Sequence, residues 1–321
     1  MKYGPWEQVA SNVAEGMVGL GVDLTLFATA NSKTAGTLAA VVESGYAETP
    51  GADAKVLECL HISHLMERAS EFDLIHNHFD FLPLTYSRLV NTPILTTIHG
   101  FSSPAIVPVY QRYNDVCDYV SISDADRSPE LRYLATVYNG IDTSQFDFQE
   151  KPSEYLLYFG RIHPDKGTWE AIQIAQQSKR PLLIAGLVQD ETYFKEKIEP
   201  LVDGNSVLYL GNAGPVQRNE LLGNALAMLH PINFEEPFGL SVAESMLCGT
   251  PVVAFSRGSM PELIRHGETG FLVKNVAEAV DAIAALPALD RAACRQHALE
   301  RFSLERMAQD YFRLYEQILS R

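Results

Sequence analysis

Two acidic residues stand eight positions apart on either side of a glycine, where a helix is expected to begin. In NFEEPFGLSVAESMLCGTPVVAF, residues 233–255, Glu236 precedes Gly239 and Glu244 lies one turn inside the helix. Backbone N–H groups at a helix start bind anions such as phosphate, whereas carboxylates accept hydrogen bonds from hydroxyl groups. Stabilisation of the helix dipole accounts for an acid in the first turn, but not for the one in the preceding loop. The pattern therefore predicts a guest that carries both phosphate and hydroxyl groups.

Two cations follow another buried strand. In YFGRIHPDKG, residues 158–167, Arg161 comes directly after the strand, and Lys166 precedes Gly167 and a helix. Ligands of open α/β sheets collect at the carboxyl ends of strands, where Arg and Lys suit a diphosphate. The alternative is a pair of solvated surface cations. A diphosphate held by the cations and the helix N–H groups, with one acid for a ribose and one for a second sugar, describes a nucleotide sugar.

Two further stretches have the residue types of a metal site. The DAD triplet at 124–126 formally satisfies a DxD motif, but it follows an apolar strand. We therefore expect the preceding Ser123, or the first aspartate of the triplet, to cap a helix. In HNHFD, His76, His78 and Asp80 could meet on one face of a strand, although a polar rim that contacts an acceptor is the preferred interpretation. We predict no metal site.

Composition excludes several classes of protein. The 321 residues carry a formal net charge of −15, and the first 148 hold 8 Lys and Arg against 18 Asp and Glu. This balance argues against a nucleic-acid partner and against association with an anionic membrane.

No apolar run reaches the roughly 20 residues that span a bilayer, and the first residues lack the apolar core of a secretory signal. The four cysteines are far apart and form no CxxC pair, which indicates that they are reduced thiols. We expect a cytoplasmic protein, and its oligomeric state stays open.

The elements that must hold these residues alternate between apolar strands and helices. Apolar runs without strict alternation, typical of strands buried on both faces, occur at 23–28, 72–78, 93–99, 119–123, 136–141, 155–160, 181–186, 207–211, 227–232, 251–255 and 270–273. Helical segments, including 7–20, 54–70, 167–178, 241–248 and 275–285, separate them. The alternation predicts an α/β fold with parallel sheets. The polar stretch 142–154 divides the chain into two similar halves.

Both ends of the chain depart from a simple doubly wound sheet. A strand normally precedes the first glycine loop, but here the loop YGPWEQ leads straight into a helix, so the pattern lacks the first and central strand. At the other end, an apolar stripe follows a potential capping residue, Ser303. The stripe consists of Leu304, Met307, Ala308, Tyr311, Leu314, Tyr315 and Ile318. It suits a helix that packs either on its own domain or back on the first one.

Several motifs together resemble the retaining glycosyltransferases of family 4, which have the GT-B fold. They are GRIHPDKG, EEPFGLSVAESMLCGTPVVA and GSMPELIRHGETGFLV, supported by TTIHG, VYNGID and the ending RFSLERMAQDYFRLYEQIL. The resemblance runs from about Tyr3 to the end and implies two Rossmann-like domains that face a cleft. Residues 1–146 would form the acceptor-binding domain, with a returning helix at 303–321. Residues 147–302 would form the nucleotide-sugar-binding domain.

The resemblance also implies roles for individual residues. Arg161 and Lys166 would hold the donor diphosphate, Glu236 the hydroxyls of the transferred sugar and Glu244 the ribose, while His99 would reach the donor sugar near the anomeric centre. Of these, Glu236, His99, Arg161 and Lys166 are the predicted catalytic residues. Further donor contacts are implied for Gly4, Gly186, Leu187, Gly211, Asn212, Phe238, Gly239 and Leu240. The family usually has paired glycines in the first loop, whereas this chain has a single one in YGPWE.

On this basis we expect a retaining, metal-independent transfer of a sugar from a nucleotide donor to an acceptor hydroxyl. No cofactor is expected. The donor is expected to be a UDP sugar, although GDP and ADP sugars also fit, and the acceptor is a small molecule or a glycan. Two alternatives stay open. One is an epimerase or hydrolase on the same fold, which would turn over the donor without an acceptor. The other is a non-catalytic or truncated nucleotide-sugar-binding protein.

Overall fold

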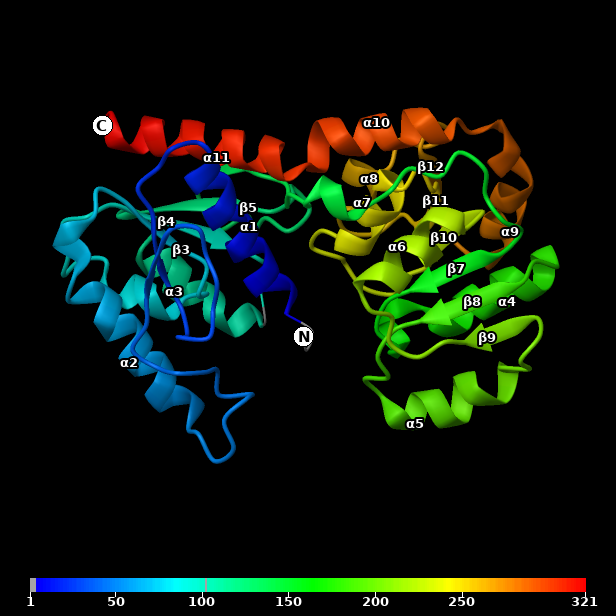
Figure 1. Cartoon of the computed structure of the whole chain (residues 1–321), viewed down its shortest axis with the longest axis horizontal. Coiled ribbons are helices and arrows are strands. Elements are labelled where there is room, and N and C mark those ends of the chain that lie inside the picture. The colour runs from blue at the N-terminus through cyan, green and yellow to red at the C-terminus, as the bar shows by residue number, and fades with distance from the viewer. Residues whose placement is uncertain (1–3, 102) are drawn as a thin grey trace. The chain divides into compact units, whose positions relative to one another are not determined.

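A computed structural model describes residues 4–101 and 103–321, which form two compact units (Figure 1). The first unit holds the described residues up to Ile122, residues 127–140 and the segment Leu304–Arg321. The second holds Ser123–Asp126 and Ile141–Ser303. The chain therefore passes into the second unit after residue 140 and returns to the first after Ser303. The boundary expected from the sequence, after residue 146, lies a few residues further along.

The first unit places helices around short parallel strands. β1 (Thr25–Phe27) pairs with β2 (Thr37–Ala39). A separate four-stranded parallel sheet has the order β3 (Ile75–Asn77), β4 (Ile94–Ile98), β5 (Cys117–Ser121) and β6 (Tyr133–Thr136). The α-helices of this unit are α1 (Pro5–Gly19), α2 (Ala54–Met66), α3 (Val107–Arg112) and α11 (Leu304–Leu319). α1 begins at Pro5, directly after Gly4, the first residue that the structure describes.

The last helix packs on the first unit and thereby confirms the returning helix of the predicted fold. α11 runs beside α1, red beside blue in Figure 1. The two helices approach closely at Gly16, where a Cβ would lie 2.7 Å from Cβ of Ala308. The apolar stripe of α11 faces inward, since Met307 and Tyr311 are fully buried. Tyr311 also joins its hydroxyl to Oγ1 of Thr97 on β4, 2.8 Å away, so the helix is anchored to the sheet by both packing and hydrogen bonding.

The second unit is built on one six-stranded parallel sheet with the order β12-β11-β10-β7-β8-β9. Its strands are β7 (Leu156–Phe159), β8 (Leu182–Ala185), β9 (Val207–Tyr209), β10 (Ala227–His230), β11 (Val252–Phe255) and β12 (Gly270–Val273). Its helices are α4 (Thr168–Ser178), α5 (Glu191–Tyr193), α6 (Pro215–Asn224), α7 (Leu240–Leu247), α8 (Met260–Leu263), α9 (Val276–Ala285) and α10 (Arg291–Phe302). The strand order reverses between β7 and β10. In such sheets a ligand crevice forms at the carboxyl ends of the strands at this point.

The strands of the second unit match the predicted apolar runs because the sheet is covered by helices on both faces. Leu156, Leu182, Ala227 and Val252 are all completely buried. In β11 all four residues, Val252–Phe255, are buried, so both faces of this strand carry apolar residues. Glycine and proline residues at the strand ends set the boundaries.

Some expectations were wrong in detail. The predicted strand at 136–141 shares only Thr136 with β6, which lies mainly before it and pairs with β5. The apolar residues after β6 are buried without forming a ladder, and Ile141 instead donates its N–H to the carbonyl of Phe302, 2.9 Å away. The helix expected at 54–70 ends at Met66, and a 3₁₀ turn, Ala69–Glu71, follows. Within the described part of the chain, no helix is both long and apolar enough to cross a membrane.

Candidate functional site

Glycines bring the carboxyl ends of β7, β8 and β9 together. Gly186, which follows β8, has φ of +150°, and a Cβ there would lie 1.8 Å from the carbonyl oxygen of Gly160 after β7. The N–H of Gly186 donates to the carbonyl of Gly211 after β9, 2.9 Å away. Only glycine allows this approach. Gly186 and Gly211, two of the predicted base-pocket residues, thus lie together at the carboxyl ends of the strands. Each is followed by an exposed residue, Leu187 and Asn212.

Arg161 follows Gly160 at the end of β7, next to the reversal of strand order. Its backbone carbonyl accepts a hydrogen bond from the Tyr158 hydroxyl, 2.7 Å away. Its guanidinium donates to the side-chain carbonyl of Gln189, in the loop after β8. Arg161 therefore lies at the carboxyl end of β7, as predicted, and its side chain is hydrogen-bonded to the loop after β8.

Lys166 meets Glu236, although the two residues are 70 positions apart. Nζ of Lys166 donates to Oε2 of Glu236 at 2.5 Å, and the side chains are only 14% and 13% exposed. The ring of Phe234 lies 4.4 Å from the same nitrogen, which adds a cation–π contact. The structure thus joins one predicted phosphate ligand directly to one predicted sugar ligand.

A tight turn makes this ion pair possible. The turn Pro164–Lys166 ends at Gly167, which has φ of +72°, and a Cβ at Gly167 would lie 1.8 Å from the carbonyl oxygen of Pro231. The N–H of Asn233 donates to the carbonyl of Asp165, 2.7 Å away. The loop after β10 is therefore packed on the turn after β7, and Lys166 can reach Glu236 because these two strands are neighbours.

The helix α7 begins without a capping side chain. Gly239 is its N-cap residue, with φ of +92° and no side-chain hydrogen bond, so Gly239 and Leu240 lie at an uncapped helix start. The preceding loop is held from behind by Ser259, whose Oγ donates to the carbonyl of Phe238 at 2.6 Å and whose N–H donates to the carbonyl of Glu236 at 2.9 Å. The positive end of the helix thus begins three residues after Glu236, and such a helix start suits an anion.

Glu244, on α7, is largely buried and is paired with a cation from another helix. Nη1 of Arg218, on α6, donates to Oε1 of Glu244 at 2.9 Å, and the two side chains are 24% and 12% exposed. Burial raises the pKa of Glu244 to about 7, although the charge of Arg218 opposes this shift. The second predicted acid is therefore engaged in the protein, as the first one is.

A buried histidine adjoins Glu236. His230 ends β10, and its Nε2 lies 3.8 Å from Oε2 of Glu236. Burial, assisted by the nearby charge of Lys166, lowers the pKa of His230 to about 3. The imidazole is neutral at ordinary pH, so this contact is not an ion pair. Nε2 of His230 also has no hydrogen-bond partner among the described residues.

In the first unit, His99 lies at the carboxyl end of β4 and is buried. Its ring stacks on Trp6 of α1 with centroids 6.2 Å apart, and its Nε2 is 2.9 Å from Nδ1 of His78. A small cavity of about 10 Å³ is lined by His99 together with Trp6, His78, Asp80, Thr97, Gly100 and Tyr110. Gly4 is the N-cap residue of the same helix, α1. The start of α1 and the ends of β3 and β4 thus lie together.

The polar residues after β3 have separate partners. His76 bonds through Nδ1 to the Tyr315 hydroxyl at 2.6 Å and through Nε2 to Oγ1 of Thr97 at 2.8 Å. Asp80 accepts a hydrogen bond from the hydroxyl of Tyr110. Over residues 4–101 and 103–321, no group of three or more His, Cys, Asp or Glu side chains is placed to hold a metal ion.

The DAD triplet is not followed by the expected helix, so that prediction was wrong. Residues 123–130 form turns, in which Oγ of Ser123 accepts a hydrogen bond from the N–H of Asp126 at 3.1 Å. Glu262 of α8 accepts the N–H groups of Asp124 and Ala125 at 2.9 and 2.8 Å. The N–H groups of Asp124 and Ala125 are therefore bonded by a glutamate that is distant in sequence, and no local helix forms.

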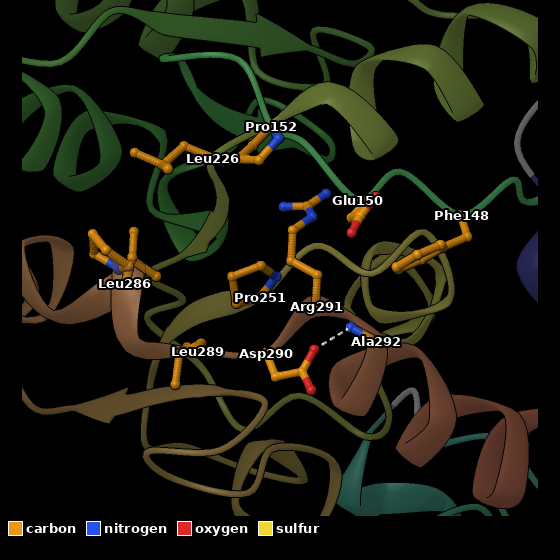
Figure 2. A pocket seen from close by; sticks show the side chains of 11 residues that line it. Phe148, Glu150, Pro152, Leu226, Pro251, Leu286, Leu289, Asp290, Arg291 and Ala292 are labelled. Carbon is orange, nitrogen blue, oxygen red and sulfur yellow. Dashed lines mark hydrogen bonds between the residues drawn. The ribbon is translucent and has the colours of Figure 1, made fainter.

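A larger hollow of about 370 Å³ lies at the amino ends of the second unit's strands (Figure 2). Pro152, Leu226 and Pro251, which precede β7, β10 and β11, line it together with the start of α10. The guanidinium of Arg291 donates to the carbonyls of Gln149 and Gly223, both at 2.7 Å, and is engaged by the backbone. None of the predicted site residues lines this hollow.

Arg218 and His230 contact predicted site residues but were not identified from the sequence, whereas His78 was named there only as part of a polar rim. His230 stands at the end of β10, a position that could have marked it. Arg218 lies in the polar stretch VQRNE, where nothing indicates burial.

Part of the chain matches a known protein family. Residues 141–299, nearly all of the second unit, match the family described as Glycosyl transferases group 1. The chain is 27% identical to the N-acetyl-alpha-D-glucosaminyl L-malate synthase of Bacillus anthracis over 70% of its own length and 68% of that protein. It is 28% identical to a glycogen synthase of Mycobacterium tuberculosis over 64% of its own length and 57% of that relative.

The fold has solved counterparts. HepE of Anabaena, in complex with UDP-glucose, superposes with a TM-score of 0.72 at 21% identity, and the match covers 99% of this chain and 96% of that one. A likeness at this identity shows the fold, here GT-B with two Rossmann-like units. The family match over residues 141–299, together with the relatives named above, shows that the chain belongs to the group 1 glycosyltransferases.

Proposed function

We propose that this chain transfers a sugar from a nucleoside diphosphate sugar to a hydroxyl of a small-molecule or glycan acceptor, with retention of the anomeric configuration. One observation carries the proposal. Lys166, Glu236 and the uncapped start of α7 gather at the carboxyl ends of β7 and β10, where the strand order reverses. A cation, a hydroxyl acceptor and a helix N-terminus in one place suit a sugar diphosphate.

The proposed chemistry depends on charge stabilisation. When the bond between the sugar and the diphosphate breaks, negative charge grows on the departing phosphate. Arg161, Lys166 and the N–H groups at the start of α7 would stabilise this charge. Glu236 would accept hydrogen bonds from the transferred sugar and Glu244 from the ribose. His99 is assigned to the transferred sugar, as the family resemblance implies. The cations take the role that a metal would otherwise have, so the reaction is proposed to proceed without one.

Retention is proposed to follow from attack on the face that the leaving group departs from. The acceptor oxygen bonds to the anomeric carbon, the bond from that carbon to the phosphate oxygen breaks, and the acceptor's proton passes to the departing phosphate. This sequence needs no nucleophile from the protein. The product and the nucleoside diphosphate account for all atoms of donor and acceptor.

A UDP sugar is the first candidate donor, supported by the UDP-glucose bound to the structurally similar HepE. GDP and ADP sugars remain in the proposal because the base would lie near backbone groups of Gly186 and Gly211. These groups can bond several bases.

The test combines binding and turnover. A thermal-shift panel of UDP, GDP, ADP and their sugars identifies the donor, because a ligand that binds only the folded state raises the melting temperature. Release of the nucleoside diphosphate is then measured with and without an acceptor panel, in EDTA, and the anomeric configuration of the product is read by NMR. Acceptor-dependent release with retention supports the proposal. Release without acceptor indicates a hydrolase, and binding without any release indicates a non-catalytic binder.

A further inference from the structure

Two imidazoles of the first unit are hydrogen-bonded to each other. His78 follows β3 and His99 follows β4, and these are neighbouring parallel strands, so the two residues meet at one edge of the sheet. Nδ1 of His78 lies 2.9 Å from Nε2 of His99, with ring centroids 5.2 Å apart. A hydrogen bond between two imidazole nitrogens needs one N–H and one lone pair, so the protonation of one ring depends on the other.

Burial makes this dependence strict. It lowers the pKa of His99 to about 4 and that of His78 well below its usual value. Both rings are therefore neutral at pH 7, and each carries a single N–H. If His78 donates from Nδ1, then His99 must carry its own proton on Nδ1. If His99 donates from Nε2, its Nδ1 is a bare acceptor. The tautomer of His78 therefore determines the tautomer of His99, and the reverse also holds.

The outer nitrogens of the pair are available to a third group. Nδ1 of His99 and Nε2 of His78 are both buried and have no hydrogen-bond partner among the described residues. Both residues line the small cavity at the ends of β3 and β4. His78 consequently decides whether the free nitrogen of His99 offers a donor or an acceptor to whatever it contacts.

The surroundings hold His78 in place. Its ring packs on His76 with centroids 4.1 Å apart, and His76 is fixed by Tyr315 of α11 and Thr97 of β4. Trp6 covers the other member of the pair, His99. The pair is thus preorganised by three elements: α1, α11 and β4.

We propose that His78 is a positioning residue that sets the tautomer and ring orientation of His99 for sugar transfer. The proposal rests on the proposed function, in which His99 contacts the transferred sugar. A partner that holds the second nitrogen of a functional histidine commonly fixes which nitrogen is protonated.

The matched variants are His78→Asn and His78→Gln. An asparagine amide places a nitrogen or oxygen near the position of Nδ1 and keeps the bond to His99, whereas glutamine has a CH₂-linked carbon there and loses it. We expect His78→Gln to lower kcat about tenfold, the effect of one lost hydrogen bond, with KM for the donor unchanged. His78→Asn should retain kcat within about threefold. Equal losses in both variants would overturn the proposal.

A second readout does not require activity. Ring ¹⁵N NMR of the unliganded full chain should show His99 in one tautomer in the parent protein and in His78→Asn, and in a mixture in His78→Gln. An unchanged His99 spectrum in His78→Gln sinks the proposal. Should the glutamine variant not fold, His78→Leu replaces it in both comparisons. If the parent protein transfers no sugar, the proposed function fails, while the NMR comparison still decides the role of His78.

Discussion

Separating Lys166 from Glu236 is expected to destabilise the second unit, and the two changes are expected not to add. The pair is 2.5 Å apart and the side chains are 14% and 13% exposed. Lys166→Met leaves a nearly buried carboxylate, and Glu236→Gln leaves a nearly buried ammonium beside Phe234. Either change removes the opposite charge but leaves the desolvated charge in place. The double variant Lys166→Met/Glu236→Gln removes both charges.

The magnitude follows from the burial of the pair. Breaking a fully buried pair costs about 3–5 kcal/mol, whereas an exposed pair contributes about 0–1 kcal/mol. A slightly exposed, charge-assisted hydrogen bond lies between these limits, so we expect each single variant to lose about 2–3 kcal/mol. The double variant should lose about as much as one single variant, which corresponds to a coupling energy of about 2–3 kcal/mol.

The assay can isolate the second unit. The chain has two tryptophans, Trp6 in the first unit and Trp169 in the second. In a Trp6→Phe background, fluorescence during urea unfolding reports the second unit alone. The control cycle uses Arg265 and Glu268, an exposed pair 3.9 Å apart, for which coupling below about 0.5 kcal/mol is expected. A coupling energy this small for Lys166 and Glu236 would refute the reasoning and mean that the pair is not a structural contact in the free protein.

Three further outcomes are expected. Arg161→Ala should lower kcat roughly 100-fold, as does the loss of one charge-stabilising group, and initial-rate kinetics near the parent's would remove its phosphate role. The first unit should lose stability as the pH falls from about 6.5 to about 4. Histidines of the unfolded chain take up protons near pH 6.5, whereas burial lowers the pKa of His76 to about 3 and that of His99 to about 4 in the folded chain, so protons favour the unfolded state in this range. An unfolding midpoint, read from Trp6 fluorescence, that does not change with pH in this range would contradict this. Gly186→Ala should destabilise the second unit by at least about 2 kcal/mol, because φ of Gly186 is +150° and the added Cβ would meet the carbonyl of Gly160. An unchanged melting temperature would show that the backbones of Gly186 and Gly160 do not approach each other this closely.

Much of the fold could be predicted from the sequence. Buried parallel strands appear as apolar runs bounded by glycine and proline, so the strands of the second unit were located within a few residues. The strand β2, Thr37–Ala39, was not predicted, and only Ala39 of its three residues is buried. The run at 136–141 was wrongly predicted as a strand because burial and strand pairing produce the same composition.

The site was predicted in part for a similar reason. The positions of Arg161, Lys166 and Glu236 could be inferred because each belongs to a local motif at a strand end or helix start. Their roles as donor ligands stay predictions. The partners of these side chains could not be inferred, since a side chain's partner depends on which strands are adjacent and not on its neighbours in sequence.

The sequence by itself determined the alternation of elements, the two-domain plan and the residue types at the strand ends, because these depend on short-range periodicity and on local backbone preferences. Only the tertiary structure decided that Lys166 pairs with Glu236, Arg218 with Glu244 and His78 with His99. Each of these pairs joins residues that are 21 to 70 positions apart. Their contact is set by the order of strands in the sheet and by helix packing, which depend on the burial of the whole core.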